Sequence, residues 1–223
     1  MDGVVRDWVD GWVLSCGAAP PVAEPWGWTV DVGLAEHVTR QVLGGVDDAV
    51  EEDTVRKVAG SVTGAGVRLK VFADPARVGG LLGPGWWVDP EPGCLMTRPL
   101  GPADDEPDLP AGYRLRTWAR GGVTRVLIAA PDGSWAARGQ VAPTGATAVV
   151  NRIETSPDHR RKGLGSRVVR HLQRAAAEQG AETGIPAGTP TGRALYESLG
   201  WTVRAPLTSA KFTGLPGPGT RGA

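Results

Sequence analysis

The chain has 223 residues, of which 41% are hydrophobic and 22% are charged. This size and composition are enough for a good hydrophobic core and for one large domain or two small ones. Lys and Arg together number 24, and Asp and Glu together number 24, so the formal net charge is zero. A general nucleic-acid binder usually carries a basic field, so we expect no nucleic acid among the partners.

Three further features narrow the class of protein. No segment approaches 18 uninterrupted apolar residues, so we expect no membrane-spanning helix. The segment MDGVVRDWVDG at the start is acidic and lacks the pattern of a signal peptide, which indicates a cytoplasmic protein. Cys16, Cys94 and the three histidines form no clustered pattern, so we expect no metal site. We expect both cysteines to be reduced, and a single Cys16–Cys94 disulfide is the alternative.

The first half of the chain has the pattern of an α/β unit. A tryptophan-rich amphipathic segment predicts a helix over residues 4–17. Most of the tryptophans lie in this half, and we expect them to pack in the core or between the two halves. The other expected elements are a strand near 28–33, helices near 35–44 and 53–61, a strand at 67–73, a helix at 75–82 and strands near 86–89 and 93–99.

A linker is expected near the middle of the chain. Residues 101–110, GPADDEPDLP, are rich in proline and acidic residues and poor in apolar ones. The expected domains are therefore an N-terminal α/β half at 1–105 and a second domain at 106–213. The remainder, 214–223, is expected to be a disordered tail.

The second half begins with two strands, at 112–118 and 123–130, joined by a glycine turn. A β-branched run at 148–155 predicts another strand, which ends at Pro157 and Asp158. A basic loop with two glycines follows, and the apolar periodicity then predicts a helix at about 164–179.

A strand, a glycine loop and a helix N-terminus in this order suit the binding of a diphosphate. The first N–H groups of a helix lack intrahelical partners, and the helix dipole adds partial positive charge there. Gly163 and Gly165 allow the backbone to approach phosphate oxygens closely, and residues 160–162 add three full positive charges. No Walker string is present, and Val168 stands where a dinucleotide-binding loop needs its third glycine, so both of those phosphate loops are excluded.

The loop has the spacing R-x-x-G-x-G, with Arg160, Gly163 and Gly165 at the fixed positions. It resembles the acetyl-CoA pyrophosphate loop of the GNAT superfamily of acyl-CoA N-acyltransferases. The expected fold is then α/β, with a mixed central sheet and flanking helices, and with the N-terminal half packed against it.

A second motif lies downstream in the order that this family has. A short strand is expected near 181–187 and a helix at 190–199, followed by another strand. The string ALYESLGW at 194–201 looks like the GNAT ending of helix, tyrosine, Leu-Gly-aromatic and strand. The resemblance covers about residues 110–212, and 106–213 would be the catalytic domain.

The resemblance implies that acetyl-CoA is the co-substrate, that no metal takes part, and that the acceptor is an amine. The diphosphate would lie on the loop and the first helical turn, and the pantetheine arm would lie along the preceding strand. Thr189 stands where the family often has an asparagine, so it keeps a hydroxyl but loses the amide. The residues assigned to acetyl-CoA binding are Ile153, Thr155, Arg160, Arg161, Lys162, Gly163, Leu164, Gly165, Ser166 and Thr189.

Two residues are candidates for proton transfer. Tyr196 falls at the family position of a general acid, and the alternative is a tyrosine that packs on the sheet. Glu154 is a carboxylate in an otherwise apolar strand, where glutamate is depleted, and it is the candidate base. The alternative for Glu154 is a salt bridge to Arg152 or to another arginine. Asp158 and His159 are expected to be solvated turn residues.

The second half also departs from the family pattern. The family normally inserts two helices between its first strands, where this chain has only a glycine turn near 118–123. We expect the N-terminal half to supply the missing wall of the acceptor pocket. That half shows a weak internal echo, with Leu-Gly-Pro-Gly-Trp at 82–86 and Leu-Gly-Trp at 199–201. It is either a degenerate GNAT-like copy without its own acetyl-CoA site or a plain N-terminal cap.

The function expected from these features is the direct transfer of an acetyl group from acetyl-CoA to an amine, with a small-molecule acceptor favoured over a protein. The alternative is a non-catalytic acyl-CoA-binding or regulatory module. A monomer or a homodimer is expected, with no membrane partner.

Overall fold

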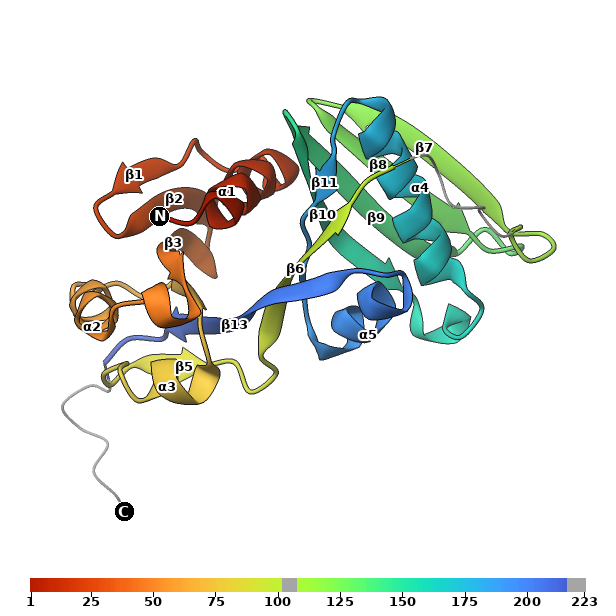
Figure 1. The fold of residues 1–223 in the computed structure, drawn as a ribbon. Coiled ribbons are helices and arrows are strands. Elements are labelled where there is room, and N and C mark those ends of the chain that lie inside the picture. The colour runs from red at the N-terminus through yellow and green to blue at the C-terminus, as the bar shows by residue number, and fades with distance from the viewer. Residues whose placement is uncertain (102–107, 216–223) are drawn as a thin grey trace, which may run out of the picture.

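The computed structural model describes residues 1–101 and 108–215, so the middle of the expected linker and most of the expected tail lie outside the described residues (Figure 1). The described helices are α1 (Gly3–Cys16), α2 (Glu52–Gly60), α3 (Pro75–Gly79), α4 (Leu164–Glu178) and α5 (Pro190–Ser198), with short 3-10 turns η1 (Asp47–Ala49) and η2 (Pro157–His159). The described strands are β1 (Val22–Glu24), β2 (Gly27–Leu34), β3 (His37–Val46), β4 (Val67–Phe72), β5 (Trp86–Val88), β6 (Gly93–Pro99), β7 (Arg114–Arg120), β8 (Val123–Ala129), β9 (Trp135–Thr144), β10 (Thr147–Thr155), β11 (Thr183–Gly184), β12 (Ala187–Gly188) and β13 (Thr202–Phe212).

The described strands form one mixed sheet, as the expected fold class requires. Its order is β1-β2-β3-β4-β13-β6-β11-β10-β9-β8-β7, with β5 beside β13 and β12 beside β6. Most neighbours are antiparallel, but β3 and β4 are parallel, and so are β10 and β11. Parallel neighbours need a crossover connection, and here each crossover is a helix.

Helices cover both faces of the sheet. In β3, Val42 packs in a core with Trp8 of α1, whereas its neighbour Leu43 packs in a separate core with Val55 of α2. Alternate residues of a strand point to opposite faces, so α1 and α2 lie on opposite faces. The same alternation in β10 places Val149 in the α1 core and its neighbours in the α4 core. Helix α1 therefore packs against both halves, on the face opposite to the other helices (Figure 1).

The two halves are joined by an exchange of their last strands. Strand β6 follows the N-terminal half but pairs with β11 and β12 of the C-terminal half. Strand β13 ends the C-terminal half but pairs with β4 and β5 of the N-terminal half. The two strands also pair with each other at the centre of the sheet. Each half therefore completes the sheet of the other.

The order of elements repeats from one half to the other. The N-terminal half has an antiparallel hairpin (β2, β3), the turn η1, α2, the parallel strand β4, α3 and β6. The C-terminal half has the hairpin β9 and β10, the turn η2, α4, the parallel strand β11, α5 and β13. The weak sequence echo lies at matching places in these two series. Descent from a degenerate second copy remains a prediction.

Two sequence expectations differ from the structure. The helix expected near 35–44 is wrong, because this segment is strand β3. Its apolar residues also fit a helical spacing, but Val38, Thr39 and Val42 are β-branched, and pairing with β2 and β4 decides the outcome. The strand expected at 181–187 is divided into β11 and β12, with Pro186 between them. Strands β1 and β9 were not expected from the sequence.

Candidate functional site

The site begins where two parallel strands separate. Strand β10 pairs with β11 only at Thr147–Thr183 and Ala148–Gly184, and the Ile185 N–H donates to the Ala148 carbonyl at 2.8 Å. Beyond Ile185 the chain turns away, and β12 pairs with β6 instead. The sheet therefore opens between the second part of β10 and β12. The loop at 160–165 follows closely after the end of β10.

A β-bulge lies on β10 beside this opening. The register with β9 shifts between Asn151 and Glu154, and Arg152 has a φ of 54°, in the left-handed region. Few residues other than glycine adopt this conformation without strain, and strained backbone is frequent at functional sites. The bulge turns Ile153 toward the α4 face, where it lies against Gly139. The expected role of Ile153 in the pantetheine arm remains a prediction.

The loop presents an open helix N-terminus. Gly163 is the N-cap of α4 with a φ of 74°, and no side chain caps the helix there. The Arg167 N–H bonds to the Gly163 carbonyl at 3.0 Å, so it begins the helical series. The N–H groups of Leu164, Gly165 and Ser166 precede it and lack intrahelical acceptors. These N–H groups, together with the exposed side chains of residues 160–162, fit a diphosphate.

The two loop glycines have different structural roles. A Cβ atom on Gly163 would meet nothing within 4 Å, so the space in front of this backbone is open. A Cβ atom on Gly165 would lie 3.3 Å from both Thr155 Oγ1 and the side chain of Leu195. Gly165 therefore brings the start of α4 close to the end of β10 and to α5. Gly163 provides the left-handed turn and free access from solvent.

Tyr113, which lies just before β7, supports the loop. The Tyr113 hydroxyl lies 2.9 Å from His159 Nδ1, and Lys162 Nζ donates to the same hydroxyl at 3.0 Å. Lys162 Nζ also lies 5.6 Å from the centroid of the Tyr113 ring, within cation–π range. His159 therefore has a hydrogen-bond partner within the protein and is not only solvated. Tyr113 lies far from the loop in sequence, so no local pattern indicated this contact.

Tyr196 is almost fully buried, with 4% of its surface exposed. Its ring packs edge-to-face on Trp201 with centroids 5.4 Å apart. It also lies next to Gly188 of β12, at the edge of the opening in the sheet. Burial raises the pKa of the Tyr196 phenol well above its usual range, and Cys94 contributes in the same direction. The hydroxyl therefore keeps its proton at neutral pH.

Glu154 makes a double contact with Arg138 of β9. Arg138 Nε and Nη2 both donate to Glu154 Oε2, at 3.0 and 2.7 Å, which leaves Oε1 outside the pair. About half of each side chain is exposed, 46% for Glu154 and 56% for Arg138. This geometry matches the alternative of a salt bridge to another arginine. It does not test a catalytic role, because the pair occupies only one of the two carboxylate oxygens.

Thr189 acts as the N-cap of α5. Its hydroxyl accepts a hydrogen bond from the Gly192 N–H at 3.3 Å, and Pro190 occupies the first helical turn. This local role accounts for a threonine at this position. Its expected contact with the CoA arm remains a prediction.

Helix α1 covers the other face of β9 and β10. Gln140 Nε2 donates to the Ser15 carbonyl at 2.7 Å, and Asn151 Nδ2 donates to Ser15 Oγ at 3.1 Å. Gly11 lies so close to Val149 that a Cβ atom would be 2.4 Å from Val149 Cγ2. The N-terminal half thus covers this face of β9 and β10 with a helix, and its expected role as a wall of the acceptor pocket remains a prediction. Glu154 lies on this same face, because its partner Arg138 is two residues from Gln140 along β9.

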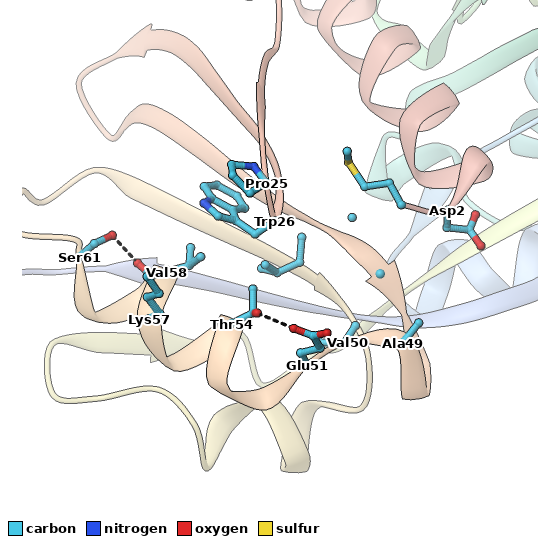
Figure 2. Close-up of a pocket in the computed structure, with 14 residues that line it drawn as sticks. Asp2, Pro25, Trp26, Ala49, Val50, Glu51, Thr54, Lys57, Val58 and Ser61 are labelled. Atoms are coloured by element: carbon cyan, nitrogen blue, oxygen red, sulfur yellow. Dashed lines mark hydrogen bonds between the residues drawn. The ribbon is translucent and has the colours of Figure 1, made fainter.

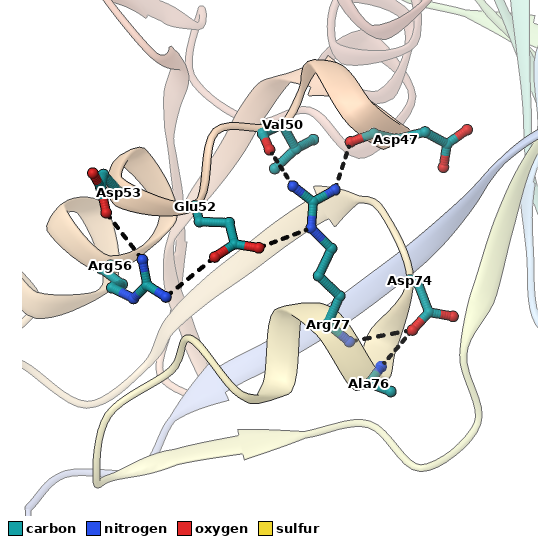
Figure 3. Close-up of polar contacts among 8 residues, drawn as sticks. All are labelled: Asp47, Val50, Glu52, Asp53, Arg56, Asp74, Ala76 and Arg77. Atoms are coloured by element: carbon teal, nitrogen blue, oxygen red, sulfur yellow. Dashed lines mark hydrogen bonds and ion pairs between the residues drawn. The ribbon is translucent and has the colours of Figure 1, made fainter.

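In the N-terminal half, the connection that corresponds to the glycine loop is occupied by an arginine side chain (Figure 3). Arg77 of α3 donates to the carbonyls of Asp47 and Val50, at 3.1 and 2.8 Å, and to Glu52 Oε1 at 3.3 Å. These groups form the β3–η1–α2 connection, which corresponds in element order to the β10–η2–α4 loop. The charge there is also reversed, with five acidic residues: Asp47, Asp48, Glu51, Glu52 and Asp53. A diphosphate does not fit this connection.

A cavity of about 980 Å³ lies in the N-terminal half, between α2, the end of β3 and the turn before β2 (Figure 2). Trp26 and Met1 supply apolar surface, and Glu51 and Lys57 supply charges of both signs. The Thr54 hydroxyl donates to Glu51 Oε2 at 3.0 Å. Only elements of the N-terminal half line the cavity, so it is separate from the loop at 160–165.

The described residues show neither a membrane helix nor a metal-binding cluster. Within residues 1–101 and 108–215, no helix combines the length and the apolar character needed to cross a membrane. In the same ranges, no group of three or more His, Cys, Asp and Glu side chains is placed to hold a metal ion. Cys16 and Cys94 are both free thiols.

Known structures resemble this chain in fold. A GCN5-related N-acetyltransferase from Kribbella flavida is 18% identical, with a TM-score of 0.65 over 95% of both chains. A putative GNAT acetyltransferase from Novosphingobium aromaticivorans is 21% identical, with a TM-score of 0.56 over 95% of this chain and 96% of that one. A GCN5-related N-acetyltransferase from Sphaerobacter thermophilus is 13% identical, with a TM-score of 0.51 over 67% of this chain and 61% of that one. Comparison with curated proteins finds no match.

The family comparison locates the resemblance in the C-terminal half. The model of the acetyltransferase (GNAT) domain matches residues 123–203, a range that includes β8 to α5, the open strand pair and the glycine loop. Members of this family use acyl-CoA, and the open N-terminus of α4 fits the diphosphate of that group. Residues 123–203 of this chain therefore match the acetyltransferase (GNAT) domain model in sequence, and the solved structures resemble the chain in fold.

Proposed function

We propose that this protein is an N-acetyltransferase that moves an acetyl group from acetyl-CoA directly to the amine of a small molecule. One observation carries most of the proposal. The uncapped N-terminus of α4, with its left-handed Gly163 and its basic loop, lies at the end of the strand that separates from its parallel neighbour. This arrangement supports the proposal because a diphosphate bound there would lie beside the point where the two strands separate.

In this proposal the chain's residues hold acetyl-CoA at two places. The N–H groups of Leu164, Gly165 and Ser166 and the side chains of residues 160–162 bind the diphosphate. Backbone groups of Ile153 and Thr155 bind the pantetheine arm along the bulged strand. When bound, this co-substrate supplies the activated acetyl group.

Transfer requires a neutral amine. An alkylamine with a pKa of about 10.4 is only about 0.04% neutral at pH 7, which corresponds to roughly 4–5 kcal/mol. A base or a desolvating pocket must supply this free energy. Glu154 Oε1 lies on the α1 face of the bulge, outside the contacts with Arg138, and we assign it as the proton acceptor.

The leaving thiolate requires a proton, and we assign Tyr196 as the donor. Its phenol remains protonated because burial raises its pKa. The ring lies against Gly188, next to the opening between β10 and β12. Proton donation at this position would let CoA leave as a thiol.

Tyr196→Phe is expected to lower kcat about 10–10³-fold at pH 7, because CoA must then leave as a thiolate. A thiol pKa near 8.5 makes this only moderately unfavourable, so the loss should shrink above about pH 8.5. The measurement is a pH–rate profile at saturating acetyl-CoA. Tyr113→Phe is the control, since it alters the loop contacts but not the proton donor. A Tyr196→Phe profile like that of the wild type would assign Tyr196 to packing alone.

Glu154→Gln is expected to lower turnover about 10²–10⁴-fold with little change in acetyl-CoA affinity, because the amide accepts no proton. The measurement combines steady-state rates with acetyl-CoA titrations. Arg138→Met keeps the carboxylate and removes its partner, so it should lose much less activity. Equal losses in both variants would show that the ion pair matters for structure rather than for proton transfer.

A second function is a non-catalytic acyl-CoA-binding module. The ion pair of Glu154 and the packing of Tyr196 on Trp201 favour it, because both residues already have structural partners. Thiol release from acetyl-CoA in the presence of a panel of amines separates the two functions. Amine-dependent release with formation of an N-acetyl product supports the transferase. Tight acetyl-CoA binding without release from any amine would support the module.

A further inference from the structure

A row of cations crosses the face of the sheet on which α1 lies. Arg40 of β3 is directly opposite Arg68 of β4, and Arg68 is directly opposite Lys211 of β13. In the next row, Lys70 of β4 is opposite Ser209 of β13, and Lys70 Nζ donates to Ser209 Oγ at 2.5 Å. Like charges directly opposite one another destabilise a sheet. This arrangement therefore lowers stability unless an anion compensates it.

Acidic side chains do not compensate these cations. Among the residues that the structure describes, no ion pair within 4.0 Å joins an acid to Arg40, Arg68 or Lys70. Asp89 is near enough to raise the pKa of Lys70 slightly, but burial and the two arginines outweigh it. Arg68 Nε is buried without a hydrogen-bond partner. Arg40 is buried, Arg68 and Lys70 are partly buried, and a backbone partner of the Arg68 side chain is the Glu36 carbonyl, at 3.4 Å from Nη2. Grouped cations without acidic partners are unfavourable in a protein, and a bound anion would compensate them.

The surroundings hold the cations in fixed positions. Arg40 is only 7% exposed, and its guanidinium carbon lies 3.6 Å from the centroid of the Trp12 ring. Its Nε donates to His37 Nε2 at 3.4 Å, which requires a neutral histidine. Burial and the charges of Arg40, Arg68 and Lys70 lower the pKa of His37 to about 3. Lys211 is exposed and lies over the ring of Trp87, at 4.7 Å from its centroid. The row thus extends from a buried end to an open one.

Helix α1 links the buried end of the row with the bulge of β10. Arg40 stacks on Trp12, and Cys16 of the same helix is close enough to influence the pKa of Arg40. The Cys16 thiol accepts a hydrogen bond from Asn151 Nδ2 at 3.6 Å. Asn151 is the residue at which the β10 bulge begins. Side chains of α1 therefore link Arg40 with the face of β10 that we assign to the acceptor.

We propose that Arg40, Arg68 and Lys70 bind an anionic group, a carboxylate or a phosphate, on the acceptor amine. The acceptor amine in this inference rests on the proposed function. Anion binding by these three residues does not require acetyl transfer. The N-terminal half then contributes specificity as well as a wall. The preferred acceptor is an amine that also carries a negative charge.

The first test measures the anion site directly. The chain has four lysines, at 57, 70, 162 and 211, so their side-chain NMR signals can be assigned by substitution. Burial lowers the pKa of Lys70 to about 7. Succinate or inorganic phosphate, added to the protein saturated with CoA, should raise the pKa of Lys70 by about one unit or more. The Lys57 signal, from α2 on the opposite face, should not move. A Lys70 pKa that is unchanged by both anions would overturn the proposal.

The second test uses pairs of acceptors that differ only in an anionic group. An ω-amino acid is compared with the alkylamine of the same length, and phosphoethanolamine with ethanolamine. The wild type should favour the anionic member by at least about tenfold in kcat/KM. Lys70→Met and Arg68→Met should each remove this preference without weakening acetyl-CoA binding, and Lys57→Met should keep it. The better of the two anions identifies a carboxylate or a phosphate site.

Different results would contradict the anion site and the proposed transferase function. Transfer to both members of each pair at equal rates would contradict the anion site and leave the transferase in place. No transfer to any amine would contradict the proposed function, and the Lys70 titration would still decide the anion site.

Discussion

Gly163→Val is expected to weaken acetyl-CoA binding by about 100-fold or more. Gly163 has a φ of 74°, which a β-branched residue adopts only with strain of about 1–2 kcal/mol or more. The new side chain would also project into the open space in front of the α4 N–H groups, which is the space assigned to the diphosphate. The backbone strain and the added side chain both change the loop that is assigned to the diphosphate. Gly165→Val should be as harmful, because its side chain would push α4 away from Thr155 and Leu195.

The measurement is a calorimetric titration of each variant with acetyl-CoA at low salt. Gly133→Val is the matched control, because Gly133 also has a positive φ, 87°, with nothing near its Cβ position, but lies in the turn between β8 and β9. It should carry a similar backbone strain and keep its affinity. Wild-type affinity in both loop variants would contradict the assignment of residues 160–166 to the diphosphate.

A fragment of residues 108–223 is expected to be insoluble or inactive, although it keeps the whole glycine loop. Removal of the first 107 residues takes away β6, which pairs with β11, β12 and β13. It also takes away β4 and β5, which pair with the rest of β13. Strand β13 would then have no partner along its length, and the face beneath α1 would be exposed. Unpaired strand edges of this kind promote aggregation.

Soluble yield and circular dichroism test this expectation. Co-expression of the fragment with residues 1–107 is the control, and it should restore solubility because it returns the missing strands. A fragment that is soluble and fully active on its own would show that the N-terminal half is an independent module. It would also contradict the role of α1 as a wall of the acceptor site.

Local sequence patterns predicted much of the C-terminal half. Helix α4, the loop before it, α5 and β10 lie where the periodicity and the glycine spacing place them, because each of these signals is local. Strand β3 was predicted as a helix because its apolar spacing fits both periods. The exchange of β6 and β13 was not predicted, since strand pairing between distant segments leaves no local signal.

In the candidate site, too, local features were predicted and contacts between distant residues were not. The loop glycines and the basic residues were identified from their spacing, and the left-handed Gly163 agrees with that identification. The contacts of Tyr113 with Lys162 and of Arg138 with Glu154 were not identified, because each joins residues on different elements. The row of Arg40, Arg68 and Lys211 was also invisible in sequence, since the strand register alone brings these residues together.

The number of acetyl-CoA molecules bound per chain tests the central claim most directly. Native mass spectrometry of the full chain counts them without an assumption about the acceptor. We expect one, held by the loop at 160–166, because Arg77 and five acidic residues occupy the matching connection in the N-terminal half. Gly163→Val should reduce this number to zero at the same concentration. No bound acetyl-CoA in the wild type, or two molecules per chain, would contradict the site assignment.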